Sequence, residues 1–348
     1  MSTQKGYFDT TIIIVMLLFA ITVFQLLPNL AHGQKQQQLF PFLPPANTAE
    51  DQINNDRQNE STASVSGSNS TPNGTNNAVI LDFYDNDIGQ FTSAKPILDK
   101  YGFKGTFFIV CNWASSHNPE RMTWQEINQL YREGHDIESH TMTHKLLDGL
   151  SARALDYEVG QSKQCIHDHL GIYPTIFSPP HDRGWDNATV INTIAKYYGL
   201  SIGGFVNDVM FLQCYGWKQK QQQQYLNQRD CRPYSDNGTL NYASRYDIKE
   251  NAGAQGHSND TMIFDRFANL VNREEMLNSN DTAKPINSVL ILGYHNINNT
   301  QTTQRDAMDA ALFDKEMKYL HDNGIRVITM SDLGYDQNSK YLYVRNNK

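Results

Sequence analysis

Residues 78–83 read AVILDF, and this short apolar run decides the fold that the sequence predicts. A continuous run of this length is typical of a strand that is buried on both faces, as in a parallel sheet. The chain before it, residues 34–77, is rich in Gln, Asn, Ser and Pro, so it holds too little apolar surface to fold and is predicted to be a disordered linker. An ordered domain is therefore expected to begin at residue 78.

Strand and helix patterns alternate from this run onwards. Further strands are predicted at residues 104–110, 136–139, 175–177, 200–204, 288–293 and 326–329. Helices are predicted at residues 93–101, 123–134, 151–170, 188–198, 262–277 and 307–322, the second opening on a capping box and the third closed by Gly171. This alternation implies an α/β fold with a parallel sheet, whose active site would lie at the C-terminal ends of the strands.

The N-terminus carries an export signal. Residues 11–27 (TIIIVMLLFAITVFQLL) are uncharged and mostly apolar, follow Lys5 and are broken by Pro28. Residues 1–33 are therefore predicted to be a signal peptide or, because the run reaches the short limit of a membrane span, a retained membrane anchor. Both alternatives place the rest of the chain outside the cell or at its surface. Residues 78–335 form the predicted domain, with a polar insertion near 211–258 and a tail at 336–348.

Composition supports the same compartment. The net charge of −8 and the pI near 5.7 argue against nucleic acid as a partner, since no basic stripe is present. Asn-X-Ser/Thr sequons recur from Asn59 to Asn298 and fit an exported, glycosylated surface. Four cysteines predict up to two disulfides, and Cys214–Cys231 is the favoured pair because these two flank one polar loop.

Two histidines stand four residues apart in residues 140–144 (HTMTH). On one helical turn, His140 and His144 would share a face and reach a single ion. A catalytic zinc site takes three protein ligands and keeps one position open, so the pair requires a third ligand elsewhere. Alone, this spacing is a weak signal, because paired histidines are more often ordinary core or surface residues.

Four polar clusters follow predicted strands, namely residues 82–87, 140–144, 178–183 and 294–296. In their order and spacing they resemble the NodB-type polysaccharide deacetylases of carbohydrate esterase family 4, over roughly residues 78–333. That family has a distorted (β/α) barrel and removes acetyl groups from N-acetylated sugars with a divalent metal, usually zinc. The resemblance thus implies a metal-dependent hydrolase whose partner is an N-acetylated polysaccharide or glycan, with membrane contact only through an N-terminal anchor.

The resemblance assigns the metal ligands. The family's first motif, Thr-Phe-Asp-Asp-Gly, falls on residues 82–86 (DFYDN), and Asp85 matches its metal-binding aspartate. The second motif, His-[Ser/Thr]-x-x-His, matches His140 and His144. These three residues supply the three ligands that a catalytic metal site requires.

The remaining motifs assign roles around the metal. The last motif, Leu-x-x-His, matches residues 292–295, so His295 is expected to protonate the leaving amine. In the third motif, residues 177–182 (FSPPHD), the proline turn survives while Ser178 stands in the arginine position. Substrate contacts are expected at Pro180, His181 and Trp185, although Trp185, like Trp113, is as readily explained as a packing residue.

The general base is the unresolved position. Tyr84 stands where the family has its base aspartate, and tyrosine is a poor proton acceptor at neutral pH. Three alternatives follow. Asp87, Asp82 or Asp182 could replace the base; the metal-activated water could react without one, more slowly; or the protein is a non-catalytic glycan-binding protein on a deacetylase scaffold.

Overall fold

The computed structural model describes residues 78–205, 209–212, 243–252, 261–277, 286, 288–298, 307–338 and 341–345. The predicted leader, residues 1–33, the linker at 34–77 and the favoured cysteine pair Cys214–Cys231 lie outside these residues and stay predictions. Among the described helices, none has the length and apolar character that crossing a bilayer requires.

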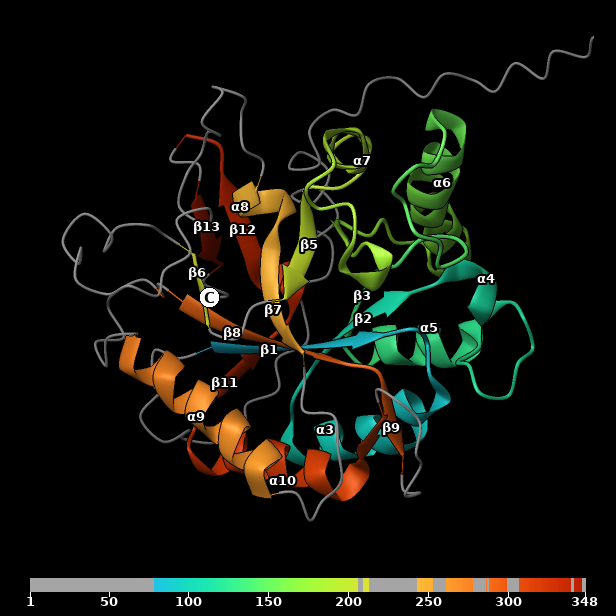
Figure 1. The fold of residues 1–348 in the computed structure, drawn as a ribbon. Helices are drawn as coiled ribbons and strands as arrows, with labels where there is room; N and C mark the ends of the chain where they lie inside the picture. The colour runs from blue at the N-terminus through green and yellow to red at the C-terminus, as the bar shows by residue number, and fades with distance from the viewer. Residues whose placement is uncertain are drawn as a thin grey trace, which may run out of the picture. The chain divides into compact units, whose positions relative to one another are not determined.

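Seven of the described strands close into a parallel barrel (Figure 1). In order around the barrel they are β1 (Ala78–Tyr84), β2 (Thr106–Ile109), β3 (Asp136–Ser139), β4 (Ile176–Phe177), β5 (Leu200–Phe205), β7 (Ile248–Ala252) and β8 (Ser288–Tyr294). β1 pairs with β2 on one side and with β8 on the other, and the second pairing closes the ring. The strand predicted at 78–83, which is β1, is therefore the strand at which the barrel closes.

The other described strands lie beside this ring. β11 (Arg326–Ile328) pairs in parallel with the start of β1, and β6 (Met210–Phe211) pairs antiparallel with β8. Two small sheets are formed by β9 (Asn296–Asn298) with β10 (Ala307–Asp309) and by β12 (Leu333–Asp336) with β13 (Tyr341–Val344). β13 therefore lies within residues 336–348, the segment that the sequence analysis predicted as a C-terminal tail.

The helices cover the outside of the barrel. They are α3 (Lys95–Tyr101), α4 (Cys111–Ala114), α5 (Trp124–Arg132), α6 (Ala152–Leu170), α7 (Ala188–Ile194), α8 (Ala243–Tyr246), α9 (Thr261–Leu277) and α10 (Ala310–Asp322), with the short turns η2 (Gln90–Ala94), η3 (Pro180–Asp182) and η5 (Met330–Asp332). In Figure 1, α10 lies between α3 and α9, which it contacts. The capping box predicted at Thr123 is present, and α6 ends at Gly171 with a φ of 74°.

Side chains of β1 alternate between two cores. Val79, Leu81 and Phe83 pack in the layer beneath the helices. Ile80 and Tyr84 pack inside the barrel. Every residue of β1 is buried because both faces of a parallel strand are covered. This alternation places Tyr84 within the barrel, at its C-terminal end, next to the turn that follows.

Two sequence-based expectations need correction. The polar insertion predicted at 211–258 extended too far, because β7 lies within it and pairs in parallel with β5 and β8 as a barrel strand. Its sequence, IKENA, is too polar to signal a buried strand. The helical turn expected at residues 140–144 is also absent, since these residues form a loop after β3.

A disulfide joins Cys111, at the start of α4, to Cys165 on α6. This disulfide is compatible with the pair Cys214–Cys231 that the sequence favours, because the two pairs share no cysteine. The bridge ties together two helices that both contact the loop at residues 140–144. It therefore bears on the site as well as on the fold.

Candidate metal centre and cleft

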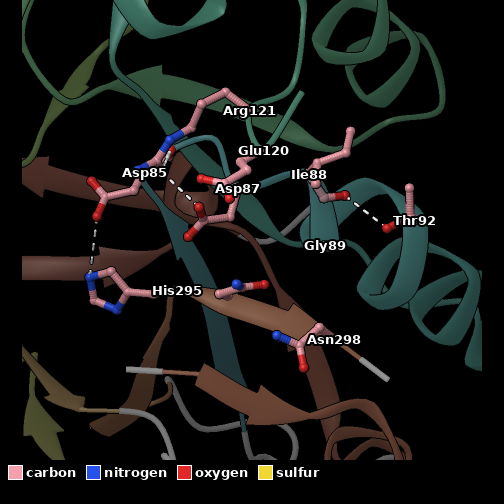
Figure 2. A pocket seen from close by; sticks show the side chains of 10 residues that line it. Asp85, Asp87, Ile88, Gly89, Thr92, Glu120, Arg121, His295 and Asn298 are labelled. Carbon is pink, nitrogen blue, oxygen red and sulfur yellow. Dashed lines mark hydrogen bonds and ion pairs between the residues drawn. The ribbon is translucent and has the colours of Figure 1, made fainter. Parts of the chain in front are cut away.

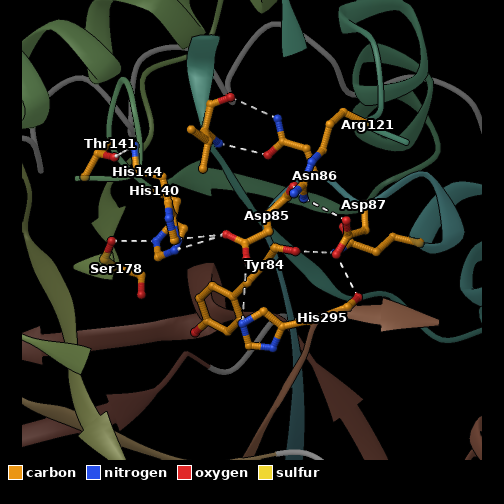
Figure 3. Close-up of polar contacts among 12 residues, drawn as sticks. Tyr84, Asp85, Asn86, Asp87, Arg121, His140, Thr141, His144, Ser178 and His295 are labelled. Carbon is orange, nitrogen blue, oxygen red and sulfur yellow. Dashed lines mark hydrogen bonds and ion pairs between the residues drawn. The ribbon is translucent and has the colours of Figure 1, made fainter. Parts of the chain in front are cut away.

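Asp85 lies in a sharp turn at the end of β1. Its φ is 74° and that of Asn86 is 53°, in the left-handed region that Asp and Asn tolerate better than most residues. The Asn86 side chain accepts from the main-chain N–H of Val110 at 2.8 Å and donates to the Val110 carbonyl at 3.0 Å. The turn is thereby fixed to the end of β2, and the Asp85 carboxylate points toward the histidine loop (Figure 3).

The histidine pair reaches Asp85 from a loop. The main-chain N–H of His140 continues the sheet by donating to the Ile109 carbonyl at 2.9 Å. Thr141 and His144 then adopt left-handed φ values of 75° and 61°, which fold the loop back so that both rings converge. The His144 N–H donates to Thr141 Oγ1 at 2.9 Å within this loop.

The three side chains form a set that fits a divalent cation. Asp85 Oδ1 lies 3.6 Å from His140 Nε2 and 3.1 Å from His144 Nε2, and the three ligand atoms lie within 4.8 Å of one another. Asp85 Oδ1 is buried without a well-oriented hydrogen bond. His140 Nδ1 lies 2.7 Å from the Ser178 carbonyl; it therefore carries the proton and leaves Nε2 free as a ligand.

Electrostatics favour the ligand states of these groups. Burial alone would raise the pKa of Asp85, but the 3.1 Å contact with His144 Nε2 and the charges of His140, His144 and His295 lower it well below its usual value. Burial lowers the pKa of His140 to about 3. The carboxylate is therefore ionised and the His140 imidazole neutral at pH 7, as metal binding requires.

A cleft of about 410 Å³ opens beside this set (Figure 2). Its lining residues are Asp85, Asp87, Ile88, Gly89, Thr92, Glu120, Arg121, His295, Asn296 and Asn298. His295, which follows β8, places Nε2 3.9 Å from Asp85 Oδ2. The structure thus brings the predicted acid and one predicted metal ligand, Asp85, to the lining of one cleft, with Asp87 in the same lining.

Asp87 is paired with Arg121. Its Oδ1 lies 2.7 Å from Arg121 Nη1, and both side chains are partly exposed to the cleft. Burial raises the pKa of Asp87 to about 7 although the Arg121 charge opposes the rise. The Arg121 guanidinium also covers the Trp113 ring at 4.2 Å, and that ring lies 4.8 Å from the His144 ring. Trp113 therefore packs against site residues.

Tyr84 directs its hydroxyl away from the cleft. The hydroxyl donates to Glu250 Oε2 at 2.6 Å inside the barrel. The ring stacks on Phe108 at 5.0 Å and lies 5.3 Å from the His140 ring and 5.5 Å from the His295 ring (Figure 3). Burial, with the Glu250 charge, raises the pKa of Tyr84 well above 10. Both the position of the phenol and the direction of its pKa disfavour Tyr84 as a proton acceptor. Its ring lies between the His140 and His295 rings.

Two other carboxylates were considered as replacements for the base. Asp82 is 0% exposed, lies deeper on the interior face of β1 and does not line the cleft. Asp182 follows the proline turn and is partly buried, with a pKa raised to about 6 by burial against the charge of Lys249. Neither lines the cleft that holds His295, whereas Asp87 does.

The proline turn lies on the His144 side of the site. Pro180 is buried, and His181 has a φ of 60° with its ring 4.7 Å from the His144 ring. Trp185 is half-buried, with Lys249 Nζ over its ring at 4.1 Å. His181 thus packs against His144, while Trp185 lies beside β7. None of the three predicted substrate contacts, Pro180, His181 and Trp185, belongs to the lining of the cleft.

Sequence reasoning missed the residues that hold the site together. Gln90 donates from Nε2 to the Tyr84 carbonyl and, at 3.0 Å, to the His295 carbonyl, which joins the ends of β1 and β8. Arg121 forms the ion pair with Asp87, and Glu250 accepts the hydrogen bond from the Tyr84 hydroxyl. Each is a single polar residue outside any motif, and no spacing in the sequence signals it.

Comparisons with known proteins match part of this chain to deacetylases. Residues 72–202 match the family model described as polysaccharide deacetylase, a range that contains the metal set but not His295. Chitin deacetylase 1 of Cryptococcus neoformans is 32% identical over 122 residues, 34% of this chain and 23% of that protein. A chitin deacetylase of Pestalotiopsis is 29% identical over 119 residues, 34% of this chain and 38% of that protein. The chain thus spans well under half the length of these relatives.

Among solved structures, the chain is similar to peptidoglycan deacetylase PdaC of Bacillus subtilis. The identity is 16% and the TM-score 0.44, with 75% of this chain and 90% of that chain covered.

Proposed function

We propose that this chain, which matches the polysaccharide deacetylase family model over residues 72–202, is a metal-dependent hydrolase that removes N-acetyl groups from a polysaccharide or cell-surface glycan. One observation carries the proposal. Asp85, His140 and His144 converge on one point, at the edge of a cleft that also holds His295 and Asp87. The names of the chitin deacetylases to which the chain is similar support N-acetylated amino sugars as the substrate class.

Asp85, His140 and His144 would hold the metal, for which zinc is the proposed ion. Two imidazoles and one carboxylate form a ligand set that zinc accepts. When bound, the ion supplies Lewis-acid activation of the acetyl carbonyl and of the attacking water. The chain's own residues then have two proton transfers to perform, one from the water and one to the departing nitrogen.

Asp87 is the proposed base. Its carboxylate lies in the cleft wall with Asp85 and His295, and Arg121 fixes its orientation through the 2.7 Å ion pair. A carboxylate held in this way can accept the proton of the water as it attacks the carbonyl carbon. Tyr84 cannot do so from its position, because its hydroxyl already donates to Glu250 within the barrel.

His295 is the proposed acid, which protonates the amide nitrogen as the C–N bond breaks. Its side chain is 31% exposed, so it can meet a substrate in the cleft. Gln90 supports it through the hydrogen bond to its main-chain carbonyl. Pro180 and His181 are proposed to contact the substrate from the proline turn, and Trp185 from further out.

A second candidate function is glycan binding without hydrolysis. It is favoured by Tyr84, which fills the position of the family's base with a ring whose hydroxyl faces away from the cleft. The two functions share the cleft and the metal and differ only in whether Asp87 takes the proton.

Exported localisation is also a proposal, extracellular or at the cell surface. It is supported by the apolar run at residues 11–27 and by the disulfide between Cys111 and Cys165, since disulfides persist mainly in oxidising compartments.

Acetate release from a panel of N-acetylated oligosaccharides, including chitin and peptidoglycan fragments, tests the proposal. The full chain loaded with zinc should release acetate. The His140→Ala variant should release none and should no longer bind zinc stoichiometrically. His321→Ala is the matched control, because that histidine is exposed on α10 and outside the site. Glycan binding with no acetate released from any substrate would reject the hydrolase in favour of the second function.

A further inference from the structure

A buried carboxylate that takes no part in the proposed chemistry holds the loop that carries both metal-binding histidines. Glu158 lies on α6 and is 2% exposed. Its Oε2 accepts a hydrogen bond from the main-chain N–H of Thr143 at 2.9 Å, and its Oε1 accepts one from the Thr143 hydroxyl at 2.5 Å. Both donors of Thr143, which lies between the two histidines, therefore end on one carboxylate.

This loop has a conformation that local sequence does not favour. Thr141 and His144 have φ values of 75° and 61°, a region that β-branched and bulky L residues rarely adopt. Such conformations persist only where the surroundings hold them in place. The loop also lacks the repeating hydrogen bonds of a helix or strand, so its shape depends on contacts with its neighbours.

α6 provides three of these contacts, and all three are made by Glu158. Besides its carboxylate, the main-chain carbonyl of Glu158 accepts from the Met142 N–H at 3.2 Å. On the other side of the loop, the Cys111 N–H donates to the Thr141 carbonyl at 3.2 Å, and the disulfide links Cys111 to α6 at Cys165. The loop is thus held between α4 and α6.

We propose that Glu158 is a positioning residue for metal binding, which holds Thr143 so that His140 and His144 converge on Asp85 before an ion arrives. Without the carboxylate the loop would order only on binding, and the cost of ordering would reduce the affinity for the ion. The inference rests on the metal centre of the proposed function, but not on hydrolysis. It can therefore be tested even if the protein proves to be a binding protein.

The experiment measures the dissociation constant for zinc by competition with a chromophoric chelator, using the full chain. Glu158→Leu should weaken zinc binding by about 10- to 100-fold, the usual effect of losing a residue that orients metal ligands. Thr143→Val, which removes only the hydroxyl, should weaken it by a smaller factor. Glu158→Gln should bind nearly as the wild type does, because its amide can accept from the Thr143 N–H and donate to the hydroxyl oxygen.

Glu316→Leu is the matched control. Glu316 is likewise a buried helix glutamate, on α10, and it bonds Tyr294 at 2.8 Å and not the loop. The Glu316→Leu substitution should lower the melting temperature without changing the dissociation constant for zinc. In Glu158→Leu, by contrast, the rise in melting temperature on adding zinc should shrink, since that rise reports affinity for the folded state.

Equal zinc constants for the wild type, Glu158→Leu and Thr143→Val would overturn the inference and leave the metal centre standing. If Glu158→Leu does not fold, Thr143→Val decides alone. Absence of zinc binding by the wild type would overturn the metal centre, and this inference with it.

Discussion

One nitrogen of Arg121 serves both the metal-binding turn and the carboxylate beside it. Arg121 Nη1 donates to the main-chain carbonyl of Asp85 at 2.5 Å and lies 2.7 Å from Asp87 Oδ1. The position of the proposed base is therefore fixed relative to the metal ligand two residues before it. The first prediction depends on this geometry.

Asp87→Asn should lower the rate of acetate release by about 10²- to 10⁴-fold, the range usually lost with a general base. The amide keeps the shape of the carboxylate but cannot accept the proton of the attacking water. Bound zinc should remain stoichiometric, which a metal analysis of the purified protein would verify. Asp99→Asn on α3 serves as the control, since Asp99 pairs with Lys95 outside the cleft. Unchanged turnover in Asp87→Asn would assign the base elsewhere.

Tyr84→Phe tests the assignment of the phenol. The change leaves the buried Glu250 carboxyl without its hydrogen-bond donor, so the free energy of unfolding should fall by about 1–3 kcal/mol. Acetate release should fall far less than in Asp87→Asn, because the ring that separates His140 from His295 is kept.

Tyr84→Asp makes the complementary test. It would remove the ring that stacks on Phe108 and add a carboxylate near Asp82 and Glu250, so it should destabilise the protein in urea unfolding without raising activity. A gain in acetate release would show that a carboxylate at position 84 acts as the general base and that Asp87 does not fill this role.

Glu316 should make stability fall as pH rises. Burial raises its pKa from 4.5 to about 8, and Tyr294 is the titratable group that faces it. Between these two pH values the unfolded chain has lost the proton that the folded protein keeps, so the free energy of unfolding decreases with rising pH and levels off above about pH 8. Each pKa unit corresponds to roughly 1.4 kcal/mol. Urea midpoints at several pH values would measure this slope.

Glu316→Gln should flatten that slope, because its amide stays neutral throughout. The exposed Asp168→Asn on α6 provides the control and should leave the slope as it is in the wild type. An identical slope in Glu316→Gln and the wild type would mean that Glu316 does not hold its proton in the folded protein.

The disulfide between Cys111 and Cys165 closes a segment with a sequence separation of 54 residues. Replacing both cysteines by serine should lower the free energy of unfolding by about 2–4 kcal/mol, chiefly by freeing the unfolded chain. Zinc affinity should fall as well, because the bridge holds α4, which bonds the Thr141 carbonyl. Parallel urea and zinc titrations check both effects, and unchanged values in both would refute the link between bridge and loop.

The sequence alone determined the frame of the protein. The apolar run at 78–83 and the alternation after it predicted a parallel sheet with helices, because burial on both faces leaves a local composition that can be recognised. The resemblance to the deacetylase family implied that this sheet closes into a barrel. The order of the motifs identified Asp85, His140, His144 and His295, which the structure brings to one site. The sequence could bring these residues to attention because each lies in a short motif at the end of a predicted strand; their roles stay predictions.

Only the tertiary structure decided how the site is held and which carboxylates line the cleft beside His295. The hydroxyl of Tyr84 donates a hydrogen bond to Glu250, which is 166 residues away in the sequence. Glu250 lies in β7, a strand whose polar sequence was not recognised as a strand. The loop shape of residues 140–144 depends on Glu158, and the orientation of Asp87 on Arg121. Such contacts form when the barrel closes and brings distant segments together, and single polar residues leave no periodic signal that would reveal them beforehand.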